Sequence, residues 1–126
     1  MIPTVLMLML AGTAAPTDNP ATKSRLWPAC LVQSARSYAP SKEAAETIAE
    51  VVMADCASYE RGARSELLVL LMGAYQHIPG GIAQMVASAE AAADRRMDDM
   101  RRQLRGKVIG IVIAERAKAA SQPPAP

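Results

Sequence analysis

Apolar residues recur every three or four positions along most of the chain, which is the spacing of one face of an α-helix. One such pattern begins at Ser41, a good N-cap residue with Glu43 in the first turn, and continues to about His77. Its apolar positions are Ala45, Ile48, Val52, Cys56, Tyr59, Ala63, Leu67, Leu70 and Ala74. The spacing keeps its phase through Gly62, although a glycine costs about 1 kcal/mol inside a helix. The sequence therefore predicts one continuous helix.

A second long pattern begins after Ile78-Pro79-Gly80-Gly81, a sequence that interrupts helices, and runs from Ile82 to about Lys118. Its apolar positions are Ile82, Met85, Ala89, Ala93, Met97, Met100, Leu104, Val108 and Ile111. Val108 to Ile113 is β-branched, but a lone strand has no pairing partner, so helix is expected there too. The two patterns predict an antiparallel hairpin of helices, each about 36 residues and about 54 Å long.

A shorter pattern precedes the hairpin. It begins at about Ser24 or Pro28 and ends at Tyr38, because Ala39-Pro40 cannot continue a helix. Its apolar stripe is Trp27, Leu31, Ala35 and Tyr38. The predicted fold is therefore all-α, with a short N-terminal helix plus a long antiparallel helical hairpin in one domain, residues 24–118. The Pro-rich residues 119–126 are expected to be a disordered tail.

The N-terminus resembles an export signal. Residues 2–12 form an apolar run that is too short to span a bilayer, and small residues follow it. We expect cleavage after Ala14, so that residues 1–14 are the signal peptide and residues 15–23 a flexible mature N-terminus. The absence of Lys and Arg before the apolar run leaves a retained anchor or a buried helix of a cytosolic protein as alternatives. The expected location is exported, either periplasmic or extracellular.

The chain has two cysteines, Cys30 and Cys56. In an exported protein such a pair favours a disulfide, which here closes a loop of about 26 residues and stabilises by about 3–4 kcal/mol. A redox pair usually has the spacing Cys-x-x-Cys, and a zinc site needs about four ligands, of which only His77 could add one. We therefore expect a structural disulfide.

Charge is distributed unevenly. The formal net charge is only +2, which is not typical of a nucleic-acid-binding protein. Residues 41–94 are acidic and residues 95–118 are basic, so the predicted hairpin sets an acidic helix against a basic one. The expected partners are Glu43 with Arg116, Glu50 with Lys107, and Asp55 with Arg105 and Arg101. The alternative for the basic face from Arg95 to Lys107 is a lipid or partner surface; no nucleic-acid partner is expected.

Catalytic, metal and cofactor signatures are weak. As a general base, His77 would need a nucleophile and an orienting partner, and the spacing shows neither. The acidic residues Glu90, Asp94, Asp98 and Asp99 do not form a calcium-binding loop, and local ion pairs explain them better. We therefore expect a non-enzymatic interaction or structural protein of the cell envelope, with no cofactor. The alternatives are a haem or metal binder using His77 and methionine, or a peripheral membrane protein using the arginine face.

One apolar segment is a candidate interface. It consists of Leu67, Leu68, Val69, Leu70, Leu71 and Met72. A helix that is apolar all round must be buried all round, yet the predicted hairpin sets this segment against the Ala-rich residues 87–92, which can cover only one side of it. Some of Leu68, Val69 and Met72 are therefore expected to remain exposed as one patch. We expect a homodimer, giving a four-helix bundle at this end, or another protein partner; a membrane surface is the less favoured partner.

Overall fold

A computed structural model describes residues 20–124, which fold into four helices and contain no strand. The helices are α1 (Pro20–Tyr38), α2 (Ala45–Asp55), α3 (Ala57–Ala74) and α4 (Gly81–Ala120). The predicted all-α class is therefore confirmed. The expected signal peptide, residues 1–14, lies outside the described residues, as do residues 15–19 and the last two residues of the expected tail.

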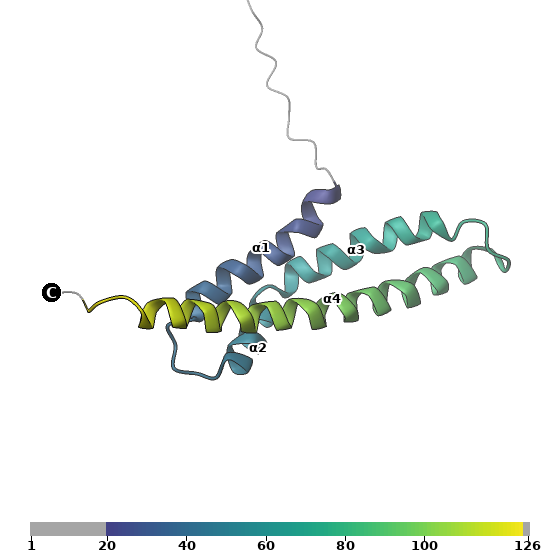
Figure 1. The fold of residues 1–126 in the computed structure, drawn as a ribbon. Coiled ribbons are helices and arrows are strands. Elements are labelled where there is room, and N and C mark those ends of the chain that lie inside the picture. Colours follow the sequence, from purple (N-terminus) through teal and green to yellow (C-terminus); the bar gives the residue numbers. More distant parts are fainter. Residues whose placement is uncertain (1–19, 125–126) are drawn as a thin grey trace, which may run out of the picture.

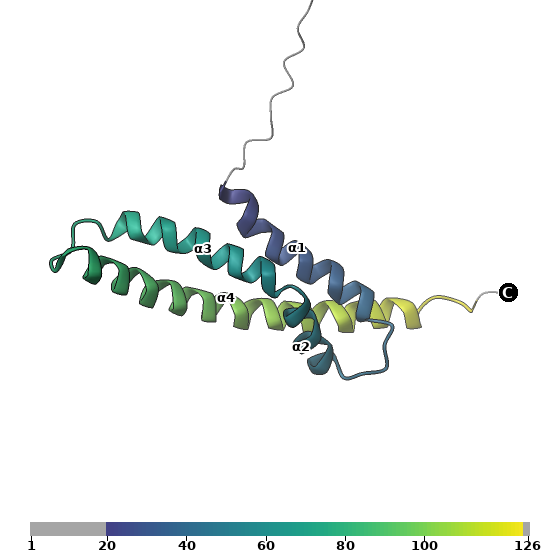
Figure 2. The same ribbon diagram turned by 180° about the vertical axis from the view of Figure 1, so that it is seen from behind.

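The longest helix, α4, runs the length of the molecule (Figure 1). In both ribbon views α1 and α3 lie above α4, and α2 lies below it (Figures 1 and 2). α1 contacts the other three helices, and α4 also contacts α2 and α3. Because every helix packs against α4, the apolar stripe of that helix organises the core.

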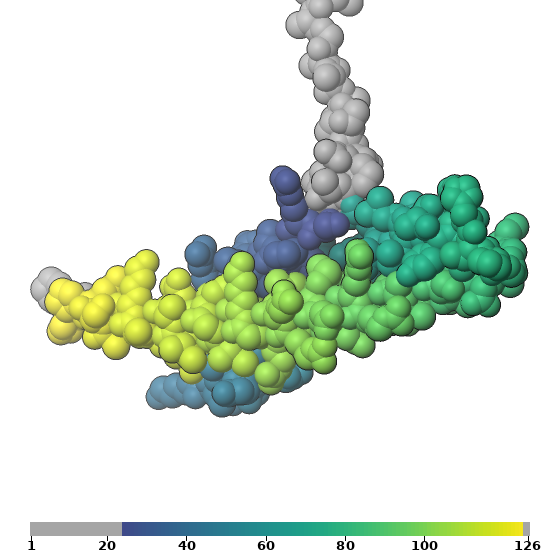
Figure 3. Space-filling model, turned by 45° about the vertical axis from the view of Figure 1, so that its right-hand side comes forward, coloured from purple at the N-terminus to yellow at the C-terminus, as the bar shows by residue number. Residues whose placement is uncertain are grey.

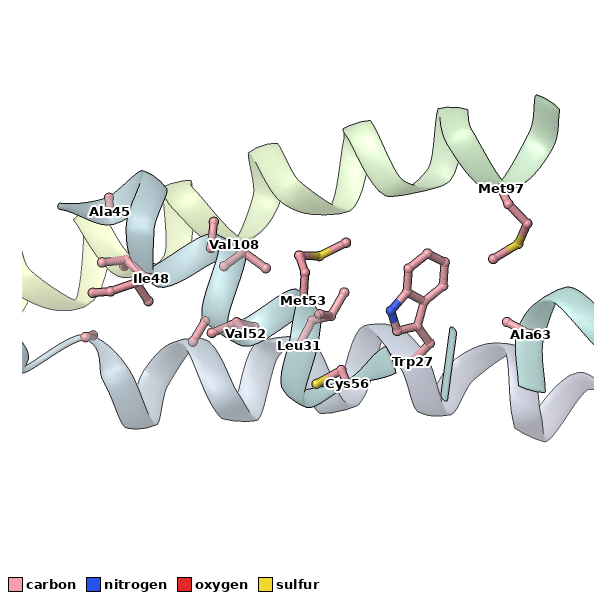
Figure 4. Close-up of a cluster of buried hydrophobic side chains, with 14 residues drawn as sticks. Trp27, Leu31, Ala45, Ile48, Val52, Met53, Cys56, Ala63, Met97 and Val108 are labelled. Carbon is pink, nitrogen blue, oxygen red and sulfur yellow. The ribbon is translucent and has the colours of Figure 1, made fainter. Parts of the chain in front are cut away.

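The main core lies where α1, the junction of α2 and α3, and α4 meet. Trp27, Leu31 and Ala35 of α1 are buried, as the predicted stripe requires. Figure 4 shows the indole of Trp27 pointing from α1 toward α4, between Met53 and Met97. A second, smaller core consists of Leu71, Ala89, Ala92 and Ala93. The alanines allow α3 and α4 to approach closely near the connection between them.

The predicted single helix from Ser41 to about His77 is wrong. It is interrupted at Cys56, which has φ −96° and ψ 11° and separates α2 from α3. Two ties from α1 meet at this point: the Cys30–Cys56 disulfide, with a Cα–Cα distance of 5.9 Å, and a 2.7 Å hydrogen bond from the Tyr38 hydroxyl to Asp55. Helical spacing continues across the break, so the pattern alone could not locate it. The tertiary contacts override the local preference.

The disulfide prediction is confirmed, but the hairpin arrangement is not. α3 and α4 do contact each other and are joined by residues 75–80. However, α2 leaves the axis of α3 and packs on the other side of α4 (Figure 2). The disulfide therefore fastens α1 to a helix junction rather than to the middle of one long helix.

The predicted start of this helix at Ser41 is also wrong. α2 begins at Ala45, and Ser41 is not its N-cap; the Ser41 hydroxyl instead accepts a 3.2 Å hydrogen bond from the backbone N–H of Glu43. Arg116 of α4 donates hydrogen bonds to the backbone carbonyls of Ala39 at 2.9 Å, Glu43 at 2.6 Å, and Ser41. A helix that began at Ser41 would use the carbonyls of Ser41 and Glu43 for its own backbone hydrogen bonds, so the contacts with Arg116 compete with such a helix.

Removal of the Arg116 side chain should therefore destabilise the protein more than removal of an arginine in a surface ion pair. We expect Arg116→Ala to lower the free energy of unfolding by about 2 kcal/mol, since it removes charged hydrogen bonds to three carbonyls. Arg105→Ala, which removes only the exposed pair with Glu50, should cost less than about 1 kcal/mol. Urea denaturation followed by circular dichroism measures both values. Equal losses would contradict this role of Arg116.

The predicted ends of α1 and α4 differ from the structure by less. α1 begins at Pro20 rather than at Ser24 or Pro28, and Tyr38 is exposed instead of completing the apolar stripe. The helix expected from Ile82 to Lys118 is confirmed in one piece as α4, including its β-branched segment. Gly80, which precedes α4, and Gly81, its first residue, have φ of 108° and 74°, a backbone conformation that glycine adopts without strain.

Within residues 20–124, none of the helices is long and apolar enough to cross a membrane. The disulfide indicates folding in an oxidising environment, as in exported proteins.

Candidate functional site

His77 and the acidic residues of α4 are the candidates that the sequence offers for catalysis or metal binding. His77 lies exposed in the connection between α3 and α4. Among the residues that the structure describes, no three His, Cys, Asp or Glu side chains lie together in a way that could hold a metal ion. The three aspartates among the acidic candidates of α4 form ion pairs instead, Asp94 with Arg64, Asp98 with Arg101, and Asp99 with Arg102, and Glu90 is exposed.

A pocket of about 550 Å³ lies between the end of α1, the α1–α2 loop and the C-terminal part of α4. Its lining includes Arg36, Lys42 and Arg116, which could suggest a site for an anion. However, Arg116 donates to loop carbonyls, and Arg36 lies 3.6 Å from Glu115. Arg116 therefore holds the loop against α4, and Arg36 joins α1 to α4, so both guanidinium groups of the pocket already have partners.

Acidic residues of α2 and α3 do pair with the basic part of α4, but with other partners than predicted. Glu50 pairs with Arg105 at 2.8 Å rather than with Lys107, and Glu60 pairs with Arg101. Asp55 pairs with neither arginine, because it accepts the hydrogen bond from Tyr38. The Glu43–Arg116 contact exists, but through the backbone carbonyl of Glu43. The break at Cys56 changes the register and so the partners.

Two of these contacts shift a pKa. The hydrogen bond to Asp55, and then the negative charge of Asp55, raise the pKa of Tyr38 above its ordinary value of 10.0. The hydrogen bond to Glu60 raises the pKa of Arg101, with partial burial acting in the opposite direction. Both groups therefore stay protonated at neutral pH and serve as hydrogen-bond donors.

The most unusual surface is the end of the molecule formed by α3 and α4, which we call the tip and define as residues 67–89. In a chain with 21% charged residues, this stretch contains no Asp, Glu, Lys or Arg. Three of its large apolar side chains are mainly in solvent: Val69 is 69% exposed, Leu70 65% and Ile82 77%. Figure 3 shows the tip, in teal and green, extending beyond α1.

The predicted interface segment lies within the tip, with its side chains distributed around α3. Leu71 is buried, and Leu67, Leu68 and Met72 are half-buried against the smaller core. Val69 and Leu70 are exposed. The exposure of Val69 agrees with the prediction. Leu70 was predicted to face the core, and this is wrong, because Leu71 is the buried residue.

Sequence reasoning missed one part of this surface. Ile82 was assigned to the core stripe of the helix predicted from Ile82 to about Lys118, yet its side chain is 77% exposed. It lies at the start of α4, beyond the last turn of α3, so no helix covers it. The lack of charge over residues 67–89 was the signal that could have extended the predicted surface to both helices.

No protein-family model matches the chain, and no curated protein or solved structure is significantly similar to it. The tip must therefore be interpreted from its own physical chemistry.

Proposed function

We propose that this chain is a small exported, non-enzymatic interaction protein of the cell envelope, and that the tip is its binding surface. The observation that carries the proposal is the uncharged tip with Val69, Leu70 and Ile82 exposed. Exposed apolar patches on soluble domains commonly mark interaction sites. The disulfide and the apolar segment before residue 15, which we interpret as a cleaved signal peptide, support an extracytoplasmic location.

The chemistry of the tip favours a protein partner over the interior of a membrane. Its far end is the connection of residues 75–80, which is not helical. Non-helical backbone is not tolerated in contact with lipid chains, since its polar groups find no partners there. At a protein interface the same groups can remain at the solvated rim while the apolar side chains are buried.

Site-specific photocrosslinking tests this proposal. A photoreactive amino acid in place of Val69 should give a crosslinked product in the producing cells, with the partner identified by mass spectrometry. The matched control has the same amino acid in place of Ile113, which is 57% exposed on α4 far along the helix from the tip. Crosslinking at position 113 but not at position 69, or at neither, would refute an interaction role for the tip.

A further inference from the structure

One face of the tip can be defined from a single ion pair. Arg64 of α3 and Asp94 of α4 are 2.9 Å apart, so they lie on the same side of the α3–α4 pair. Residues four or seven apart on a helix share a face. The face that begins at this ion pair therefore continues along α3 through Leu68 and Met72. Along α4 it continues through Glu90, Ala87 and Ala83.

The two halves of this face differ in side-chain size. α3 contributes Leu68 and Met72, which are half-buried, with exposed Val69 at their edge. α4 contributes the exposed alanines Ala83 and Ala87. Large side chains on one helix pack best against small ones on another. A surface that has a large half and a small half side by side is complementary to a copy of itself turned by 180°.

The charges that border the face are also complementary to those of a second copy turned by 180°. On the α3 half, Arg61 and Arg64 precede the apolar positions; on the α4 half, Glu90 and Asp94 follow the alanines. Glu66 does not belong to this face, because it accepts a hydrogen bond from Ser24 of α1. If α3 of one copy lies over α4 of another, arginines face a carboxylate. If α3 lies over α3, arginines face arginines, which is unfavourable.

We propose that a second copy of this chain occupies the face, with α3 of each protomer over α4 of its partner around a twofold axis parallel to the helices. The inference rests on the proposed function of the tip and adds the identity of the partner. The result is a four-helix bundle made of two tips. Between residues 67 and 89 neither protomer brings an Asp, Glu, Lys or Arg into the contact, so no ionised side chain of those types must be desolvated there.

Sedimentation velocity of the purified mature protein, from about 1 to about 100 µM, tests the dimer. The parent protein should change from a monomer to a species of twice the mass across this range. Val69→Glu and Ala87→Lys, both at exposed positions, should each remain monomeric with the circular dichroism spectrum of the parent. An equimolar mixture of the two variants should regain the dimer, because one protomer then presents glutamate on α3 to lysine on α4 of the other.

Ile113→Glu is the matched control, since it places the same charge at an exposed apolar position outside the tip; it should dimerise like the parent. A parent protein that is monomeric at every concentration overturns the dimer. If the crosslink at position 69 then leads to a different protein, the proposed function survives without this inference. A mixture of the two variants that stays monomeric while the parent dimerises overturns the arrangement of α3 over α4.

Discussion

Replacement of both cysteines, Cys30→Ala with Cys56→Ala, is expected to lower the free energy of unfolding by about 3–4 kcal/mol. The bridge joins residues 26 positions apart, and its loss increases the conformational entropy of the unfolded chain, which no longer has this loop closed. The consequence is large because a small domain has only about 5–15 kcal/mol of stability in total. The bridge also fastens α1, which carries the buried tryptophan, to the junction of α2 and α3.

Urea denaturation of the parent protein, with and without a reducing agent, provides the comparison. The reduced parent should have the stability of the double variant, and the double variant should not respond to the reducing agent. Ser65→Ala serves as a control, because its exposed hydroxyl bonds only to the carbonyl of Arg61 in the same helix; it should change stability by about 0.5 kcal/mol or less. An oxidised parent no more stable than the double variant would contradict a stabilising bridge.

The sequence was informative where one local rule decides the outcome. Two cysteines that can pair only with each other predict the disulfide, and a proline followed by two glycines predicts the end of a helix. The long run of helical spacing in α4 likewise predicts a continuous helix, since no proline interrupts it. In these cases nothing elsewhere in the chain competes with the local signal.

The sequence was misleading where distant residues compete with local ones. Arg116 takes carbonyls that a helix beginning at Ser41 would use, and it lies 75 residues away. The junction at Cys56 depends on ties to α1 that helical spacing cannot reveal. Once α2 and α3 separate, the ion-pair register moves, which explains why Glu50 pairs with Arg105 rather than Lys107.

The candidate surface was only half predictable for the same reason. Apolar residues around all sides of a helix predict that some of them find no cover. Which ones remain exposed depends on the rotation of α3 against α4, and this places Leu71 inward and Leu70 outward. Successive residues of a helix point about 100° apart, so an error of one residue in the predicted orientation changes which side chain is exposed.

Truncation of the central tryptophan, Trp27→Ala, is expected to be as damaging as loss of the disulfide, at about 3–5 kcal/mol. Trp27 is 0% exposed and lies among side chains from α2, α3 and α4. Alanine leaves a cavity that these helices cannot all close, since the disulfide and the Arg116 contacts hold the surrounding helices in place.

A second variant separates the size of the ring from its polarity. Within the described part of the chain the buried indole N–H of Trp27 has no hydrogen-bond partner, and such a donor costs about 1–3 kcal/mol. Trp27→Phe fills most of the cavity and removes this donor, so its loss of unfolding free energy should be less than half of that of Trp27→Ala.

Leu26→Ala, at the neighbouring and exposed position of α1, is the control and should have a small effect. Urea denaturation followed by circular dichroism at 222 nm measures all three without relying on tryptophan fluorescence. A Trp27→Phe variant as unstable as Trp27→Ala would contradict this expectation.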